Sequence, residues 1–125
     1  MLQELRDHFW DFGDALILGF TYSSPLRALH IEDNSLEMTL HCMNHSNSSK
    51  FIILKLLFTQ VVQFQIKEEV VDPIFGALIK EEDGIILIDF FPIIYSSLED
   101  LREDPESPCK VRFRAVTYTI VEELE

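Results

Sequence analysis

The sequence HCMNH at residues 41–45 is the densest cluster of side chains that could bind a metal ion. Two histidines four residues apart can bind zinc together when they share one face of a helix. Here His41 and Cys42 end a stretch that alternates as a strand does, and His45 begins a polar loop, so the two imidazoles should point apart. We therefore predict surface histidines and no metal site. Because neighbours on a strand face opposite ways, His41 and Cys42 are not a catalytic pair either.

Asp89 lies within the apolar stretch Ile85 to Phe91, where a carboxylate is costly to bury unless it is paired or hydrogen bonded. A general acid or base with a raised pKa is the functional interpretation. The structural interpretation is an ion pair with Arg112 or Arg114 on the last predicted strand, or a side chain turned to solvent. We favour the structural interpretation.

Other catalytic signatures are missing from the sequence. It contains no phosphate-binding loop, nucleophile elbow, HExxH motif, kinase signature or dinucleotide fingerprint, and its four glycines are not clustered. We therefore predict a protein that is not an enzyme and that binds no cofactor.

Acidic residues dominate the charge, since 22 Asp and Glu against 10 Lys and Arg give a formal net charge of −12. Such a surface repels nucleic acid and anionic lipid, so we expect neither nucleic acid nor a membrane as a partner. It attracts cationic proteins and accelerates their association. The alternative is that the acidity only keeps a bacterial cytosolic protein in solution.

The acidic runs fall at predicted turns and at the ends of elements, so we expect them at the rims of a sheet. Together with exposed aromatic side chains they could form a protein-binding patch. The candidate binding residues are Trp10, Tyr22, Glu81, Glu82, Asp83, Asp89 and Tyr95.

The elements that position these residues are organised around Phe51 to Ile66, FIILKLLFTQVVQFQI. Its β-branched and aromatic residues favour extended structure, and apolar residues on both faces predict a central strand that is covered on both sides. A straight strand of this length would span about 50 Å at about 3.3 Å per residue, too far for a small domain. We therefore expect a bend or bulge near Thr59 and Gln60.

The rest of the pattern predicts a short helix over residues 2–12 and strands joined mainly by turns of hairpin length. The further predicted strands are residues 15–22, 26–32, 35–42, 74–80, 85–91 and 110–121, with turns at Asp33-Asn34 and Asp83-Gly84. Ser96 or Ser97 begins a short helix near residues 97–103. The fold class is therefore α+β, with a mainly antiparallel sheet of about seven or eight strands, curled or two-layered, in a single domain over residues 1–125.

Two further features concern the subcellular location of the protein. No apolar stretch reaches the roughly 20 residues of a membrane helix, because Lys55 and Gln60 interrupt the longest one, and the N-terminus lacks a signal-peptide core. The two cysteines, Cys42 and Cys109, form no CxxC pair, so we expect reduced thiols. Both features predict a cytoplasmic protein.

The run FGDALILGFTYSSPLRALHIEDNSLEMTLHC, followed by FIILKLLFTQVVQFQI, resembles small bacterial proteins of unassigned function and some polymorphic-toxin immunity proteins. The residues that carry the resemblance lie within residues 12–67 and are Asp14, Asp33, Asn34, Phe58 and Val61 or Val62. The resemblance implies a cytosolic binding protein that blocks a toxin, often a basic nuclease, by acidic complementarity. It implies no catalytic residue.

Our leading hypothesis is a non-enzymatic binding protein, of the immunity type, for a basic protein partner. One alternative is a small-ligand-binding protein or an enzyme with a cavity between the sheet and the N-terminal helix. The other is a homo-oligomeric structural domain that pairs through an exposed strand edge.

Overall fold

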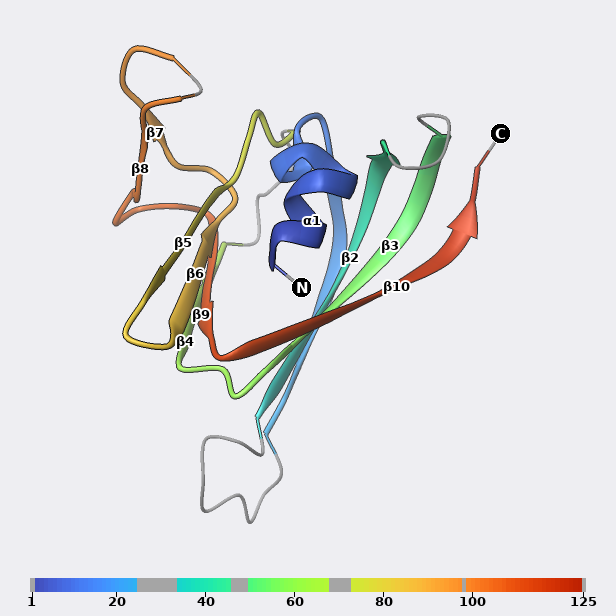
Figure 1. Cartoon of the computed structure of the whole chain (residues 1–125). Helices are drawn as coiled ribbons and strands as arrows, with labels where there is room; N and C mark the ends of the chain where they lie inside the picture. Colours follow the sequence, from blue (N-terminus) through green and yellow to red (C-terminus); the bar gives the residue numbers. More distant parts are fainter. Residues whose placement is uncertain (1, 25–33, 46–49, 68–72, 98, 125) are drawn as a thin grey trace.

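The computed structural model describes residues 2–24, 34–45, 50–67, 73–97 and 99–124 (Figure 1). The elements in these ranges are α1 Leu2–Phe9, η1 Trp10–Phe12 (a 3-10 turn), β1 Leu16–Ser23, β2 Ser35–Asn44, β3 Lys50–Thr59, β4 Gln63–Ile66, β5 Leu78–Glu82, β6 Ile85–Asp89, β7 Ile93–Ile94, β8 Leu101–Arg102, β9 Cys109–Phe113 and β10 Ala115–Glu123. The strands pair antiparallel, which confirms the mainly antiparallel α+β class. The predicted strand at residues 26–32 lies outside the described residues.

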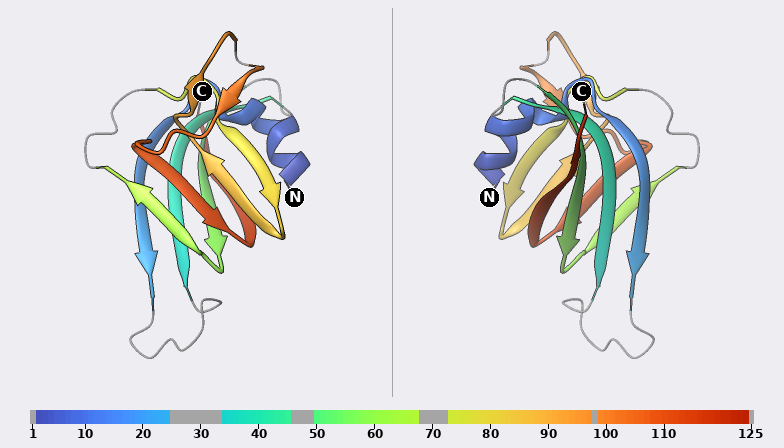
Figure 2. Two further views of the ribbon diagram at one scale, coloured as in Figure 1. Left: turned by 90° about the vertical axis from the view of Figure 1, so that its left-hand side faces the viewer. Right: turned by 90° about the vertical axis from the view of Figure 1, so that its right-hand side faces the viewer.

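Eight of the strands form two four-stranded sheets that face each other, so the chain adopts the two-layered alternative (Figure 2). Sheet A has the order β1-β2-β3-β10, and sheet B has the order β4-β9-β6-β5. Alternate side chains of each strand point inward and share one apolar core. Phe58 of sheet A and Phe113 of sheet B meet in this core, with 4.6 Å between their ring centroids.

The central run begins as β3, between β2 and β10, and its inner face is fully buried as predicted. The inner-face residues are Ile52, Leu54, Leu56 and Phe58. The predicted bend also occurs, because Gln60 has a φ of 54° and the chain then enters sheet B as β4. The prediction that both faces are covered is wrong. Phe51 and Leu57 on the outer face are 42% and 37% exposed, since no described helix or strand packs over that side of sheet A (Figure 2).

The predicted last strand is likewise divided between the sheets. β9 belongs to sheet B and β10 to sheet A, with Arg114 at the corner between them. The Arg114 backbone N–H donates to the Thr59 carbonyl at 3.3 Å, so the two crossings between sheets lie side by side. Phe113 and Val116 are both buried although they are three residues apart. The corner therefore shifts the inward-facing pattern by one residue.

Helix α1 lies in the opening between the sheets (Figure 1). Its buried residues, Leu5 and Phe9, join the shared core. On one side Glu4 accepts a hydrogen bond of 2.8 Å from the Tyr118 hydroxyl of β10. On the other side Arg6 donates to a backbone carbonyl of β5. The helix therefore bridges one edge of each sheet and closes that side of the molecule.

The helix ends earlier than residue 12, where the sequence predicts its end. Asp11 and Phe12 have φ values of 53° and 61°, in the left-handed region, which an α-helix does not contain. The buried Phe12 ring nevertheless stays in the core, stacked on Phe9.

The predicted second helix is wrong, because the described residues between 96 and 103 form a turn and β8. The Ser97 hydroxyl accepts a hydrogen bond of 3.1 Å from the Glu99 N–H, so this serine stabilises a local turn. The flanking strands β7 and β8 pair into a short hairpin that projects from the sandwich (Figure 1). Side-chain capping patterns of this kind occur at turns as well as at helix starts, which is why the pattern misled the prediction.

Candidate functional site

The outer face of sheet B carries a row of three side chains, one from each of three neighbouring strands: Lys80, Leu87 and Arg112. The register places Leu87 of β6 opposite both Lys80 of β5 and Arg112 of β9. Residues opposite each other in antiparallel strands share a face. Because the neighbouring Ile88 and Val111 are fully buried in the core, the row points outward.

The tip of the β5–β6 hairpin adds two carboxylates beside this row. Asp83 and Gly84 have φ values of 54° and 78°, as a type I′ turn requires, so the predicted turn is confirmed. Glu82 lies opposite Ile85, next to Lys80 on the same outer face. The hairpin therefore presents exposed acidic groups directly beside the row.

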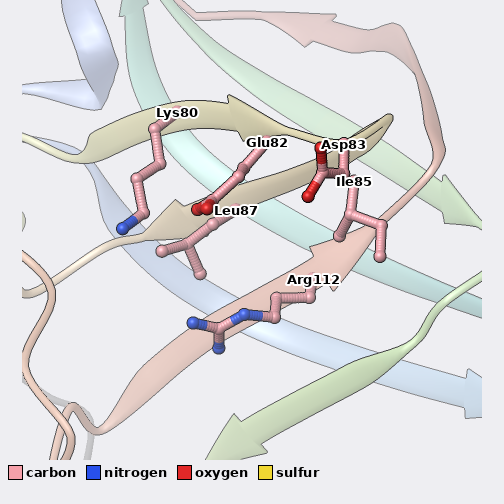
Figure 3. Close-up of a pocket in the computed structure, with 6 residues that line it drawn as sticks. All are labelled: Lys80, Glu82, Asp83, Ile85, Leu87 and Arg112. Atoms are coloured by element: carbon pink, nitrogen blue, oxygen red, sulfur yellow. The ribbon is translucent and has the colours of Figure 1, made fainter.

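These side chains line a shallow pocket of about 220 Å³ (Figure 3). The lining residues are Lys80, Glu82, Asp83, Ile85, Leu87 and Arg112. The buried Leu87 gives the pocket an apolar base, and charged groups surround it. Such a pocket suits a long side chain that has an apolar stem and a charged end.

Glu103, from the segment after β8, forms ion pairs with the basic groups of the row. Arg112 Nη2 lies 2.6 Å from both carboxylate oxygens, and the nearly buried Lys110 donates to Oε2 at 3.0 Å. Lys80 Nζ lies 3.9 Å from Oε1. The hydrogen bond from Arg112 is the main cause that lowers the pKa of Glu103 below its ordinary value of 4.5, so this carboxylate stays ionised.

Unlike Glu103, the acidic residues of the β5–β6 hairpin do not pair with basic side chains in the described ranges. Glu81, Glu82 and Asp83 are exposed and form no ion pair with any residue in the described ranges. By contrast, seven of the nine basic side chains in those ranges already form ion pairs. These are Arg6, Lys55, Lys67, Lys80, Arg102, Lys110 and Arg112. The hairpin therefore contributes negative charge that a cationic partner can use.

Asp89 has a structural role, because it anchors the segment that carries Glu103. Its fully buried carboxylate accepts hydrogen bonds from the Ser107 hydroxyl at 2.6 Å and from the backbone N–H groups of Asp104 and Phe91 at 2.9 and 3.1 Å. The expected arginine partner is wrong, since the described contacts of Asp89 are these three and the arginine of β9 binds Glu103 instead. Two backbone N–H groups and one hydroxyl therefore supply the hydrogen bonds that this buried carboxyl group requires.

The predicted binding residues do not form one surface. Tyr22 lies on β1, at the edge of sheet A farthest from the helix-covered edge. Tyr95 lies on the projecting β7–β8 hairpin, where the Arg102 guanidinium is 3.9 Å from its ring centroid. Trp10 belongs to η1, and its side chain lies outside the description. Glu82 and Asp83 line the pocket of sheet B, whereas Glu81 lines a separate pocket beside α1.

The two cysteines are free thiols, and burial raises the pKa of each to about 12. Cys42 points inward while His41 points outward, with its ring stacked on Phe51 at 5.1 Å, so the predicted separation of the two side chains is confirmed. Among the residues that the structure describes, no group of three or more His, Cys, Asp or Glu side chains is arranged to hold a metal ion.

A second pocket, of about 350 Å³, lies between α1 and β5 and bears on the small-ligand alternative. It is lined by Leu2, Gln3, Arg6, Lys80 and Glu81. Beneath it, the buried Leu5 and Phe9 fill the space between the helix and the sheets. A ligand between helix and sheet would therefore have to lie at the surface.

The sequence interpretation missed Glu103 and Lys110. Lys110 and Arg112 two residues apart on one strand indicate a basic face, so the alternation contained part of the signal. Their acidic partner comes from an irregular segment, and no local pattern connects it to them.

Comparisons with models of protein families, with curated proteins and with solved structures found no match. The described helices are too short and too polar to cross a membrane.

Proposed function

We propose that the chain is a non-enzymatic binding protein that holds a basic protein partner on the outer face of sheet B. One observation carries the proposal. Glu82 and Asp83 have no ionic partner in the described part of the chain, whereas Lys80 and Arg112 beside them already form ion pairs with Glu103. The pocket therefore combines two carboxylates that have no ionic partner in the described ranges with two basic groups that are already in ion pairs.

A lysine or arginine of the partner fits the chemistry of this pocket. Its aliphatic stem would cover Leu87 and Ile85, and its charged end would reach Glu82 and Asp83. An arginine can donate two parallel hydrogen bonds to a single carboxylate, which adds specificity to the attraction. The net charge of −12 would also speed the encounter with a cationic partner.

In its most specific form, the proposal is a cytoplasmic bacterial immunity protein that covers the cationic surface of a basic toxin. The support for this form is the resemblance over residues 12–67 together with the acidic hairpin.

The proposal is tested by comparing three immobilised baits with lysate from the cells that encode the protein. The baits are the wild type, a site variant with Glu82→Gln and Asp83→Asn, and a control with Glu99→Gln and Glu122→Gln. Asn tolerates the positive φ at position 83, so the turn should be preserved. The control removes the same charge from exposed positions outside the pocket.

A protein captured by the wild type would then be purified and titrated against all three baits by calorimetry. We expect the site variant to bind about tenfold to a hundredfold more weakly and the control to change Kd by less than about threefold. Affinity for the wild type should fall as salt rises. Equal losses in the two variants would show attraction by general acidity, and unchanged binding by the site variant would place the interaction elsewhere; both results contradict the proposal.

A further inference from the structure

No described helix or strand covers the side of the sandwich opposite α1. β1 and β4 are the last strands of their sheets on this side (Figure 2). The register places Phe20 and Tyr22 opposite fully buried residues of β2, so both rings lie on the inner face of sheet A. They are nevertheless 48% and 40% exposed. Phe64 of β4 is 37% exposed, and its ring is tilted against that of Tyr22 with 4.6 Å between the centroids. Inward-facing aromatic rings on this side are therefore only partly covered by the described residues.

The other strand edges are protected against pairing with a further strand. β5 carries charged side chains at Lys80, Glu81 and Glu82, and α1 binds one of its backbone carbonyls. β10 ends in two glutamates and contacts α1 through Tyr118. β4 has only four residues. Short length, charge and a covering helix are the usual means of blocking an edge.

β1 has none of these protections in the part of the chain that the structure describes. Its eight residues, LILGFTYS, include no charged residue and no proline. A bulge between Ile17 and Gly19 interrupts the pairing with β2, but the register is regular from Gly19 to Ser23. A neutral, apolar edge with regular geometry is a template for another strand.

We infer that β1 pairs antiparallel with β1 of a second copy of this chain, about a two-fold axis at Thr21. This register places Thr21 opposite Thr21, Phe20 opposite Tyr22 and Gly19 opposite Ser23 of the second copy. Aromatic pairs and threonine pairs across neighbouring strands are stabilising. The strand complements itself, as a contact about a two-fold axis requires.

Charge supports a second copy at this edge. Two chains with a net charge of −12 repel each other over most of their surface, but β1 brings no charge to the contact. Pairing would join two copies of sheet A into one continuous sheet and cover Phe20 and Tyr22. The β5–β6 hairpins would lie at the far edges of the dimer, so this inference is independent of the proposed partner site.

The test is sedimentation equilibrium of the full chain over a range of concentrations. A contact through five residues a strand is small, so we expect a weak dimer that forms as the concentration rises from about 5 µM to about 500 µM. The dimer should have twice the chain mass of 14.6 kDa. Thr21→Lys, which places two ammonium groups at the axis, should remain a monomer. Thr117→Lys, on the outer face of β10 at the opposite edge of sheet A, should form dimers as the wild type does.

Hydrogen exchange of the wild type provides a second measurement that needs no substitution. Amides of residues 16–23 should exchange more slowly at high concentration, while those of β10 should not change. A wild-type chain that stays monomeric over the whole range overturns the inference. So does a dimer that survives Thr21→Lys, or one that Thr117→Lys abolishes, since the latter would use the outer face of sheet A.

Discussion

The two sheets share one core but differ on their outer faces. The outer face of sheet A mixes exposed apolar residues such as Phe51 and Leu57 with threonines and, among the described residues, has a single ion pair of 3.4 Å between Lys55 and Glu37. The outer face of sheet B is charged, and the segment after β8 is fastened over it by Asp89 and Glu103. The inner faces of both sheets therefore determine the fold. The ion pairs and the acidic hairpin beside a pocket distinguish the outer face of sheet B as the candidate functional face.

The largest expected effect separates the inner and outer faces of sheet A. Phe58→Ala removes a fully buried ring that joins the two sheets, so we expect a loss of about 3–5 kcal/mol in the free energy of unfolding. Leu57→Ala, on the next residue but on the outer face, should cost less than about 1 kcal/mol. Urea denaturation measures both. Similar losses would mean that the outer face is covered after all.

The next effect concerns Asp89, which anchors the segment after β8 over the outer face of sheet B. Asp89→Ala leaves two backbone N–H groups without their acceptor and the Ser107 hydroxyl with the Cys109 carbonyl alone, so we expect a loss of about 3 kcal/mol. The matched control is Asp100→Ala, which removes a surface ion pair with Arg102 and should cost no more than about 1 kcal/mol. If thermal unfolding showed the same small change for both variants, Asp89 would not anchor this segment.

A smaller, pH-dependent effect is expected at Glu103. Because Arg112 lowers the pKa of Glu103 in the native state, the unfolded chain takes up this proton more readily. The stabilisation is therefore complete above the unfolded pKa, near 4.5, and disappears as the pH falls through the lower native pKa. Glu103→Gln should cost about 2 kcal/mol at pH 7, and progressively less as the pH is lowered below about 4.5. A constant difference between pH 7 and pH 3 would contradict the assigned network.

The smallest effect is on reactivity rather than stability. Cys42 of sheet A and Cys109 of sheet B both point into the core, and burial raises their pKa to about 12. We expect neither thiol to react with a disulfide reagent in the native protein, and both to react after unfolding in denaturant. Rapid reaction of one thiol in native protein would show that its sheet opens toward solvent.

The sequence is sufficient to predict the inner faces and the turn at Asp83-Gly84, because alternation and positive-φ residues are local signals. It cannot show that Gln60 and Arg114 are corners between two sheets, since a strand that changes sheet keeps an extended pattern on both sides. It also cannot show that the apolar outer face of β3 is bare, because cover depends on distant elements. For the site, the acidic hairpin is predictable, whereas the link between Glu103 and Arg112 exists only in three dimensions.

The central claim is that a partner binds the outer face of sheet B at the acidic hairpin. The most direct measurement is hydrogen exchange of this chain with and without the purified partner. We predict slower exchange in residues 78–89 and in β9 on binding, with β1 and β2 unchanged at a fixed concentration of this chain. Slower exchange confined to β1, β2 and β3, with the hairpin unaffected, would contradict the claim.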